Sequence, residues 1–578
     1  MNQTVKTNYP ALYTLIVVFF FWGFIAAGNN IFIPFCKDYF HLDQFQSQLI
    51  DFAFYTAYYV GALILFALSN LKGKDLVTYW GYKRSIVFGL LFSTIGAVAM
   101  ILAVEANVYY GMLIGLFTVA LGFSLQQTAA NPFAILLGDE KTGASRVNLG
   151  GGINSLGTTI GPLVVAFALF GTTAAVNNDQ IKLLSLDKVI LLYICVGLLF
   201  VGAAALFFFS KKLPNGKSAE PIEKAPKALN VLLVMTLLLG LSFAPIFNSY
   251  RSKSAFRIEH LEKQKLTKQQ IGKLNSSEAA VYKTKEKQVD SEIKSLKKPL
   301  DANRFKWLTV ALAVVLLGIF TAYFSAKRNA TGWGAMKYPQ LVLGMLAIFT
   351  YVGVEVAIGS NLGELLKTSE FGGLSSSEVA PYISMYWGSM MIGRWAGAVS
   401  AFKLSKNKQL FLTIVLPLIA FAIILTANTL ATYNMTHFYM FVVCVIIQIA
   451  LIILTKNSPS KTLFAFSLFG IIAMLVGLNT TGNIAIYAFL CGGLACSIMW
   501  PAIYNLSLMG LGKYTAQGSA FLIMMILGGG IIPPIQGKVA DIIGVHASYF
   551  VSLLCFVYLL IFALVVVKIL RKQNIDLN

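Results

Sequence analysis

The sequence predicts an all-α protein that crosses a membrane many times. Hydrophobic residues make up 57% of its 578 residues and charged residues 12%, half of the roughly 25% that is typical of a soluble protein. Sixteen apolar stretches are long enough to cross a bilayer as helices. Because so few charged residues cannot cover so much apolar surface in water, the composition excludes a soluble multi-domain protein.

The expected spans are apolar stretches with few charges, each about 17 residues or longer, which is the length that a helix needs to cross the hydrocarbon core. They lie near 11–35, 49–69, 85–104, 108–137, 150–171, 188–210, 228–248, 306–326, 338–366, 380–403, 409–428, 436–454, 461–478, 482–508, 518–537 and 547–570. An even number of spans places both termini on the same side of the membrane.

The distribution of positive charge predicts which side this is. Lys and Arg number 45 against 24 acidic residues, for a net charge of +21, and membrane proteins concentrate Lys and Arg in cytoplasmic loops. With both termini in the cytoplasm, the inner loops are basic, as at 70–84, and the short outer loops hold few cations, such as Lys188 and Lys367. We therefore expect a multi-pass protein of the cell (inner) membrane, and the basic excess calls for no nucleic-acid partner.

The segment 249–305 departs from this pattern. It would lie outside, yet it holds 14 Lys and Arg residues and 7 acidic residues. Long segments can translocate regardless of their charge. Val289, Ile293 and Leu296 recur at helical spacing, and Gly272–Ser277 is suited to a turn. We expect a solvated helical hairpin, with a partner-binding surface as the alternative.

Two parts of the chain resemble each other. Pro132 is followed by a glycine-rich stretch and by Pro162 after 30 residues, and Pro501 is followed by a similar stretch and by Pro533 after 32 residues. Parallel repeats of helix bundles form a central substrate site between their halves in one large class of transporters. The repeat therefore predicts two related bundles, with Pro132 and Pro501 as structural or gating positions.

Ionisable residues inside the expected spans are few. Such a group is costly in a bilayer and is a candidate for function by default. Glu355 lies in the middle of its span, where it can bind substrate or carry a coupling ion. Asp51 begins the second span at its outer end and is a second candidate for coupling. Arg394 lies toward the inner end of its span and is a candidate for gating, although Asp51 and Arg394 could also extend to the interfaces.

Uncharged polar and aromatic residues in the spans indicate the kind of ligand. Amide side chains donate and accept hydrogen bonds at once, and aromatic rings can stack on the apolar face of a sugar. A dianionic ligand would call for more buried Arg or Lys, so we expect a neutral polyol. The candidate binding residues of this kind are Asn30, Gln126, Gln127, Asn131, Asn154, Asn361, Trp387, Trp500 and Asn505, in addition to Glu355.

Enzymatic activity is the rival from another functional class. A membrane enzyme needs a catalytic constellation, and the sequence offers no paired carboxylates and no Ser/His/Asp set at one depth. The six cysteines have no metal-ligand spacing. We therefore expect a protein that is not an enzyme, with no cofactor and no metal.

Four motifs stand out in the spans, namely Phe21-Trp22-Gly23-Phe24, Gln127-Thr-Ala-Ala-Asn-Pro-Phe133, Tyr351-Val-Gly-Val-Glu355 and Ile392-Gly-Arg394. They resemble the fucose–proton symporter family of the major facilitator superfamily, and the motif that ends at Glu355 resembles its glucose/galactose branch. The resemblance implies a major facilitator fold, with two six-helix bundles, alternating access and uptake of a monosaccharide with a proton or a sodium ion. It also implies sugar contacts by Asn30, Asn131 and Asn154.

The sequence departs from the family pattern at three positions in the first half. Ile33 and Gln127 stand where the family has acidic residues, and Gly151 stands where it has a glutamine. The resemblance therefore implies no proton coupling through the first half, and Glu355 becomes the main candidate. The loss of both acids also leaves open a sugar sensor that does not transport.

About four helices exceed the twelve that the family implies. We expect a first bundle over 1–210, an inserted helix pair with the basic segment over 211–337, and a second bundle over 338–578. A further pair lies within 409–478, but the sequence does not single it out among three similar helices. Peptide transporters of the same superfamily also carry an inserted pair, so a peptide or muropeptide carrier remains an alternative.

Overall fold

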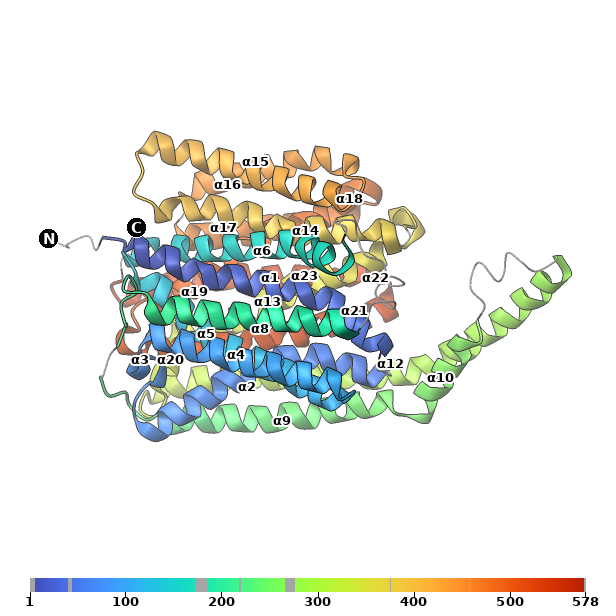
Figure 1. The fold of residues 1–578 in the computed structure, drawn as a ribbon, viewed down its shortest axis with the longest axis horizontal. Coiled ribbons are helices and arrows are strands. Elements are labelled where there is room, and N and C mark those ends of the chain that lie inside the picture. Colours follow the sequence, from blue (N-terminus) through green and yellow to red (C-terminus); the bar gives the residue numbers. More distant parts are fainter. Residues whose placement is uncertain are drawn as a thin grey trace.

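In a computed structural model, the protein is a bundle of long helices lying side by side, with one helical hairpin that extends beyond the bundle (Figure 1). The structure describes residues 6–39, 44–171, 186–217, 220–265, 276–374, 376–456 and 458–575. Of residues 25–39, 44–49, 51, 140, 166, 169, 170, 186, 189, 276–280, 376 and 377 it describes the backbone alone.

The described helices fall into three consecutive groups. The first is α1 (Tyr9–Tyr39), α2 (Gln44–Lys72), α3 (Leu76–Trp80), α4 (Tyr82–Glu105), α5 (Tyr109–Leu136), α6 (Gly143–Phe170) and α8 (Leu186–Phe209). The second is α9 (Pro226–Tyr250), α10 (Lys253–Lys263) and α12 (Ser276–Arg328). The third is α13 (Pro339–Leu366), α14 (Ser376–Ala398), α15 (Lys406–Leu430), α16 (Val442–Thr455), α17 (Pro459–Asn479), α18 (Gly482–Cys496), α19 (Met499–Leu508), α20 (Thr515–Met524), α21 (Ile532–Ile543), α22 (Val545–Ser548) and α23 (Phe550–Lys572).

Each of the sixteen expected spans coincides with a helical stretch. Within the described residues, 13 of these stretches are long and apolar enough to cross a membrane. The other three are α1, α6 and α14, and α6 packs against both α1 and α14. In α1 the side chains are described only as far as Phe24, so its described apolar stretch, Tyr9–Phe24, is shorter than a span.

The packing of the first group recurs in the third. In the first group α1 packs on α6, α2 on α5, and α4 on both α5 and α8. In the third group α13 packs on α21, α14 on α18, and α17 on both α18 and α23. The repeat seen in the sequence is therefore a repeat of helix contacts, and the two groups are called the first and second halves below.

The recurrent packing assigns a role to each helix of 406–479. In the second half α17 has the contacts that α4 has in the first, whereas α15 and α16 have no counterpart there. The helix α15 packs on the outside of α14 and on α16. We infer that α15 and α16 are the added pair that the sequence could not single out.

Contrary to the expectation of one continuous helix per span, the two spans that contain the repeated motif in the second half are interrupted. Residues Ser497 and Ile498 separate α18 from α19, and a 3-10 helix, η7 (Met525–Gly530), separates α20 from α21. Pro501 lies in the first turn of α19, where a proline is tolerated. Gly528 approaches α13 so closely that a Cβ atom would lie 1.9 Å from the Phe349 carbonyl oxygen. The break therefore lets two backbones touch.

The inserted helices bridge the two halves. The helix α9 packs on α2, where the Tyr59 hydroxyl lies 2.8 Å from Thr236 Oγ1. The helix α12 packs on α13 and α21, and Lys538 of α21 donates to Asp301 of α12 at 2.7 Å. The pair therefore contacts α2 of the first half and both α13 and α21 of the second half.

The basic insert forms the expected helical hairpin, which consists of α10 and the first part of α12. The 53-residue α12 is about 80 Å long at 1.5 Å per residue, so the hairpin and the span near 306–326 share one helix. Ile258, Leu261 and Ile293 are buried between the hairpin helices, with Val289 and Leu296 beside them. The expected turn at Gly272–Ser277 lies mostly outside the described residues.

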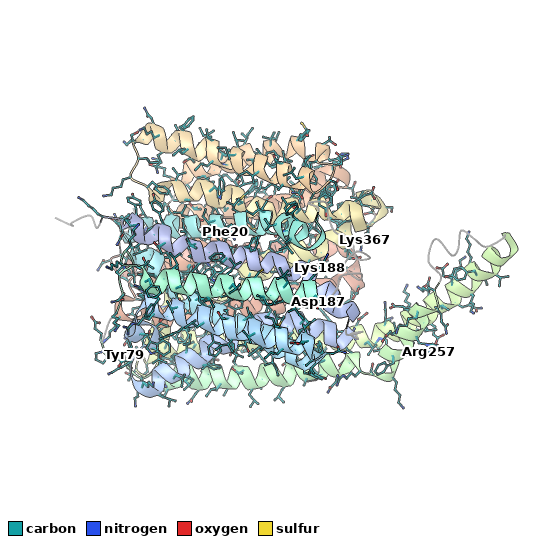
Figure 2. All side chains as sticks on the ribbon, in the orientation of Figure 1. Phe20, Tyr79, Asp187, Lys188, Arg257 and Lys367 are labelled. Carbon is teal, nitrogen blue, oxygen red and sulfur yellow. The ribbon has the colours of Figure 1, made fainter. Side chains whose placement is uncertain are left out.

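The hairpin and the chain ends lie at opposite ends of the bundle. The helix α1 begins and α23 ends at the end where Figure 1 marks N and C, and the hairpin extends from the other. Lys188 and Lys367, expected in outer loops, lie toward the hairpin end, and Tyr79 lies toward the other end (Figure 2). The arrangement agrees with an even number of crossings.

A buried arginine closes the end of α5. Arg146 has no exposed surface, and its guanidinium donates to the carbonyl oxygens of Ala134 and Asp139, each at 2.7 Å, and to that of Ile135. The last carbonyl groups of a helix lack partners within the helix and carry partial negative charge. Arg146 therefore satisfies the end of the helix that carries Gln126, Gln127 and Asn131.

We expect Arg146→Gln to destabilise the folded protein by about 3 kcal/mol, because buried acceptors without a donor cost about 1–3 kcal/mol each. Thermal unfolding in detergent, followed by fluorescence, should show a midpoint several degrees lower. The matched control is Arg84→Gln, which changes an exposed arginine in a neighbouring helix and should leave the midpoint unchanged. Equal midpoints for both variants would contradict the capping role.

Candidate functional site

The polar centre of the bundle is an ion pair between two helices of the second half. Glu355 lies in the middle third of α13, and Arg394 lies in the last third of α14. Arg394 Nη2 is 3.5 Å from Glu355 Oε1, and the two side chains keep 15% and 14% of their surface exposed. The sequence left open whether these groups meet, and in the structure they do.

Aromatic residues surround the carboxylate. The Tyr351 hydroxyl donates to Glu355 Oε1 at 3.0 Å, and the Tyr386 hydroxyl donates to the Glu355 carbonyl oxygen at 2.7 Å. The ring of Trp500 lies 6.0 Å from that of Tyr351, between centroids, and stacks on Tyr504 at 5.9 Å. Trp500 is partly exposed. Tyr351 thus lies between the carboxylate, to which it donates, and a partly exposed indole ring.

Arg394 also contacts the first half. Its Nη1 donates to Ser155 Oγ at 2.8 Å and lies 3.5 Å from the Gly151 carbonyl oxygen, both on α6. Its Nε donates to the Ser497 carbonyl oxygen at 3.1 Å, at the break between α18 and α19. The helix α14 packs on α6 and α13, and α19 packs on the same two helices. The site therefore lies between the halves.

The predicted amides of the first half differ in their surroundings. Gln126 is fully buried and bonded at both ends, because Trp22 Nε1 donates to it at 2.7 Å and it donates to Ser93 Oγ at 3.1 Å. These bonds join three helices, which is a structural role. Gln127, one residue on, is partly exposed and donates to the Tyr58 hydroxyl at 3.3 Å.

Asn131 and Asn154 are the two amides for which the family resemblance implies sugar contact. Asn131 is 3% exposed and donates to the Gln127 carbonyl oxygen at 3.1 Å. Asn154 is partly exposed and donates to the Phe19 carbonyl oxygen at 3.0 Å. Asn154 directly precedes Ser155, which Arg394 contacts, and its own bond joins α6 to α1.

The remaining predicted residues are spread over the bundle. Asn361 donates to the Ala357 carbonyl oxygen at 2.8 Å in the last third of α13. Trp387 is 38% exposed and packs edge-on against Tyr386. Asn505 is 1% exposed and lies against Gly143, at the start of α6. The roles of these three residues stay predictions.

Asn30 and Asp51 belong to α1 and α2, but their side chains lie outside the described residues. Pro132 lies inside α5, which continues through it without a break. Pro501 lies in the first turn of α19, next to Trp500 in the chain. Of the two prolines, Pro501 is the one that coincides with a break in a span.

The sequence analysis missed Tyr351 and Ser155 as members of the site. Tyr351 precedes Glu355 by four residues, so the helical period alone places both on one face. Ser155 had no such signal, because its contact with Arg394 joins different halves. Only the fold brings these residues together.

Several direct hydrogen bonds between the halves lie at the ion pair and toward the end that carries the chain termini. The Tyr9 hydroxyl donates to the Ala401 carbonyl oxygen at 3.4 Å, and Ser519 Oγ donates to the Thr128 carbonyl oxygen at 2.7 Å. Trp395 Nε1 donates to the Gly152 carbonyl oxygen at 3.1 Å. The halves are therefore joined at that end.

Comparison with known proteins agrees with this architecture. The "Glucose/galactose transporter" of Brucella abortus (strain 2308) is 28% identical over 564 residues, which cover 97% of this chain and 95% of the relative. The "Putative glucose/galactose transporter" of Helicobacter pylori (strain ATCC 700392 / 26695) is 28% identical over 565 residues, covering 96% and 97%. The "L-fucose-proton symporter" of Escherichia coli (strain K12) is 23% identical over 553 residues, covering 95% and 91%.

The solved structure of an Escherichia coli fucose:proton symporter is similar in fold, with a TM-score of 0.58 at 20% identity, covering 97% of this chain and 99% of that one. The same transporter in its outward conformation gives a TM-score of 0.60 at 20% identity, covering 96% and 98%. These relatives are named as transporters and not as enzymes, which agrees with the expected class. Residues 14–461 match the Major Facilitator Superfamily. The chain belongs to this superfamily, which confirms the predicted fold class.

Proposed function

We propose that this protein takes up a monosaccharide of the glucose/galactose type by alternating access, with the two halves moving about the site at Glu355 and Arg394. The observation that carries the proposal is the Glu355–Arg394 ion pair of the second half, whose arginine also donates to Ser155 of the first half. The partly exposed Trp500 packs near Tyr351, and the partly exposed Asn154 precedes Ser155 in α6. An indole face, amides and a single carboxylate suit a neutral polyol. The names of the relatives that match almost the whole chain support the same class of substrate.

We propose a proton as the coupled ion and Glu355 as its site. Glu355 is the carboxylate that lies deep in a helix of the second half, and Ile33 and Gln127 occupy the positions of the family's acids in the first half. The printed name of the Escherichia coli relative, a fucose–proton symporter, supports a proton. No relative named above supports sodium.

The substrate class is tested by counterflow in proteoliposomes. Vesicles loaded with unlabelled D-glucose or D-galactose should take up the labelled sugar transiently, because exchange needs no ion gradient. Vesicles loaded with di- or tripeptides or with muropeptides should not take up their labelled counterparts. Exchange of peptides alone would favour the peptide carrier, and binding of sugar without exchange would favour the sensor.

We propose that the chain lies in the inner membrane with its termini in the cytoplasm and the hairpin outside. The position of the hairpin opposite the chain ends supports this orientation. The basic loops at the end of the bundle where Tyr79 lies support it as well. Lys285→Cys, on the hairpin, should react with a membrane-impermeant thiol reagent in intact cells. Reaction only after permeabilisation would invert the orientation. Lys83→Cys, near the start of α4, is the matched control and should react only after permeabilisation.

A further inference from the structure

Arg394 is bonded to both halves at once. Its Nη2 lies 3.5 Å from Glu355 Oε1 on α13, and its Nη1 donates to Ser155 Oγ on α6 at 2.8 Å. We propose that Arg394 is a positioning residue that converts protonation of Glu355 into separation of the two halves at the end that carries the termini. The inference rests on the proposed function, in which Glu355 takes up the proton.

The absence of a side chain at Gly151 makes room for this contact. A Cβ atom on Gly151 would lie 3.2 Å from Arg394 Cδ, so a longer side chain would displace the arginine. The carbonyl oxygen of Gly151 lies 3.5 Å from Nη1, and the neighbouring Trp395 donates to Gly152 at 3.1 Å. The helix α6 thus offers acceptors to Arg394 but no charge.

Glu355 supplies the compensating charge. Among the described residues, the other titratable groups around the ion pair are uncharged near neutral pH, and none of them lies on α6. They are Tyr351 on α13, Tyr386 on α14 and Cys496 at the end of α18. When Glu355 is protonated, the guanidinium keeps its hydrogen bonds to Ser155 and Ser497 but loses its only anionic partner among these groups.

An uncompensated cation is costly to keep away from water. The joined arrangement, in which Arg394 is 15% exposed, should therefore lose stability when Glu355 is neutral. Separation of α14 from α6 lets water reach the guanidinium and lowers that cost. Since the bonds between the halves extend from this pair toward the chain termini, the separation opens that end.

Asn148→Cys reports this opening without sugar. Asn148 is 6% exposed, and its amide nitrogen lies 2.6 Å from the position of a Cβ on Gly397, across the interface between α6 and α14. We expect its alkylation by a maleimide, corrected for the parent chain, to be slow at alkaline pH. Acidic pH should accelerate it about tenfold, the size of a modest shift between two states.

Two variants separate the role of the charge from simple loosening. In the Asn148→Cys chain, Glu355→Gln should be labelled fast at every pH. Adding Arg394→Met removes the uncompensated cation, so the double change should return labelling to the slow rate without pH dependence. Fast labelling of the double variant would overturn the proposal. The maleimide reaction itself also varies with pH. Lys403→Cys, which changes an exposed residue, is therefore labelled in parallel to correct for this variation.

A second measurement tests the proposal even if the double variant fails to fold. Ser155→Ala removes the bond from Nη1 but keeps both charges, so labelling should accelerate and still respond to pH. The matched control is Thr159→Ala, one turn further along α6, which bonds to the Ser155 carbonyl oxygen and not to Arg394. Equal rates for both variants would overturn the proposal. Because no sugar is present, a failure of counterflow with this labelling pattern intact would refute only the proposed substrate.

Discussion

Glu355→Gln should abolish concentrative uptake while preserving sugar exchange. Glutamine keeps the size of the side chain and resembles protonated glutamate, but it cannot release a proton. The variant in proteoliposomes should therefore equilibrate labelled glucose across the membrane and stop there. The wild type should accumulate glucose when the outside is more acidic than the inside, and accumulation should increase as the outer pH falls. The variant should show no such dependence.

Glu364→Gln is the matched control for this prediction. Glu364 lies on the same helix, but it is 64% exposed and pairs with Lys367 at 2.8 Å near the hairpin end. Its substitution should leave accumulation unchanged. Concentrative uptake by the Glu355 variant would move the coupling elsewhere, with Asp51 as the next candidate. If the wild type only equilibrates its sugar, the protein is a facilitator, and Glu355 then serves as a ligand.

Asn154→Ala should weaken sugar binding about tenfold to a hundredfold, because losing a hydrogen-bond partner costs about 1–3 kcal/mol. Asn154 is partly exposed, so its amide is open to a ligand, and the family resemblance implies that it contacts the sugar. Asn131→Ala should have the smaller effect, because that side chain is 3% exposed. The apparent affinity from exchange at varied sugar concentration measures both.

Which of these two variants has the larger loss of apparent sugar affinity tests where the sugar lies. An equal or larger effect of Asn131→Ala would place the sugar nearer α5, on the side of Gln127. Unchanged affinity in both variants would leave the amides with helix packing alone. Retention of thermal stability in both variants is the control, since each side chain donates one hydrogen bond to a backbone carbonyl group.

The sequence was sufficient for the spans because hydropathy depends on local composition. It also allowed the helical hairpin to be predicted, since Val289, Ile293 and Leu296 recur at helical spacing. In the structure Ile293 is buried against α10, with the other two beside it. It could not separate α15 and α16 from α17, because all three are similarly apolar. The distinction depends on which helices each one contacts, and these contacts are distant in sequence.

The candidate site could be predicted only in part, because some of its contacts join helices that are distant in sequence. Glu355 was identifiable because a carboxylate deep in an apolar span is costly. Its pairing with Arg394 and the contact of Arg394 with Ser155 depend on the approach of α13, α14 and α6. Gln126 illustrates why an amide is harder to assign. In sequence it resembles a ligand-binding group, but in the structure both ends of its side chain are bonded, to Trp22 and to Ser93.

The central claim is that sugar and protons move together through Glu355. The most direct test is to add D-glucose to proteoliposomes without any initial pH gradient and to record the external pH. The wild type should make the medium more alkaline as sugar enters, and the rate should follow sugar uptake. Glu355→Gln should take up sugar without this change. Sugar entry into wild-type vesicles with no alkalinisation, or alkalinisation that persists in the variant, would contradict the account.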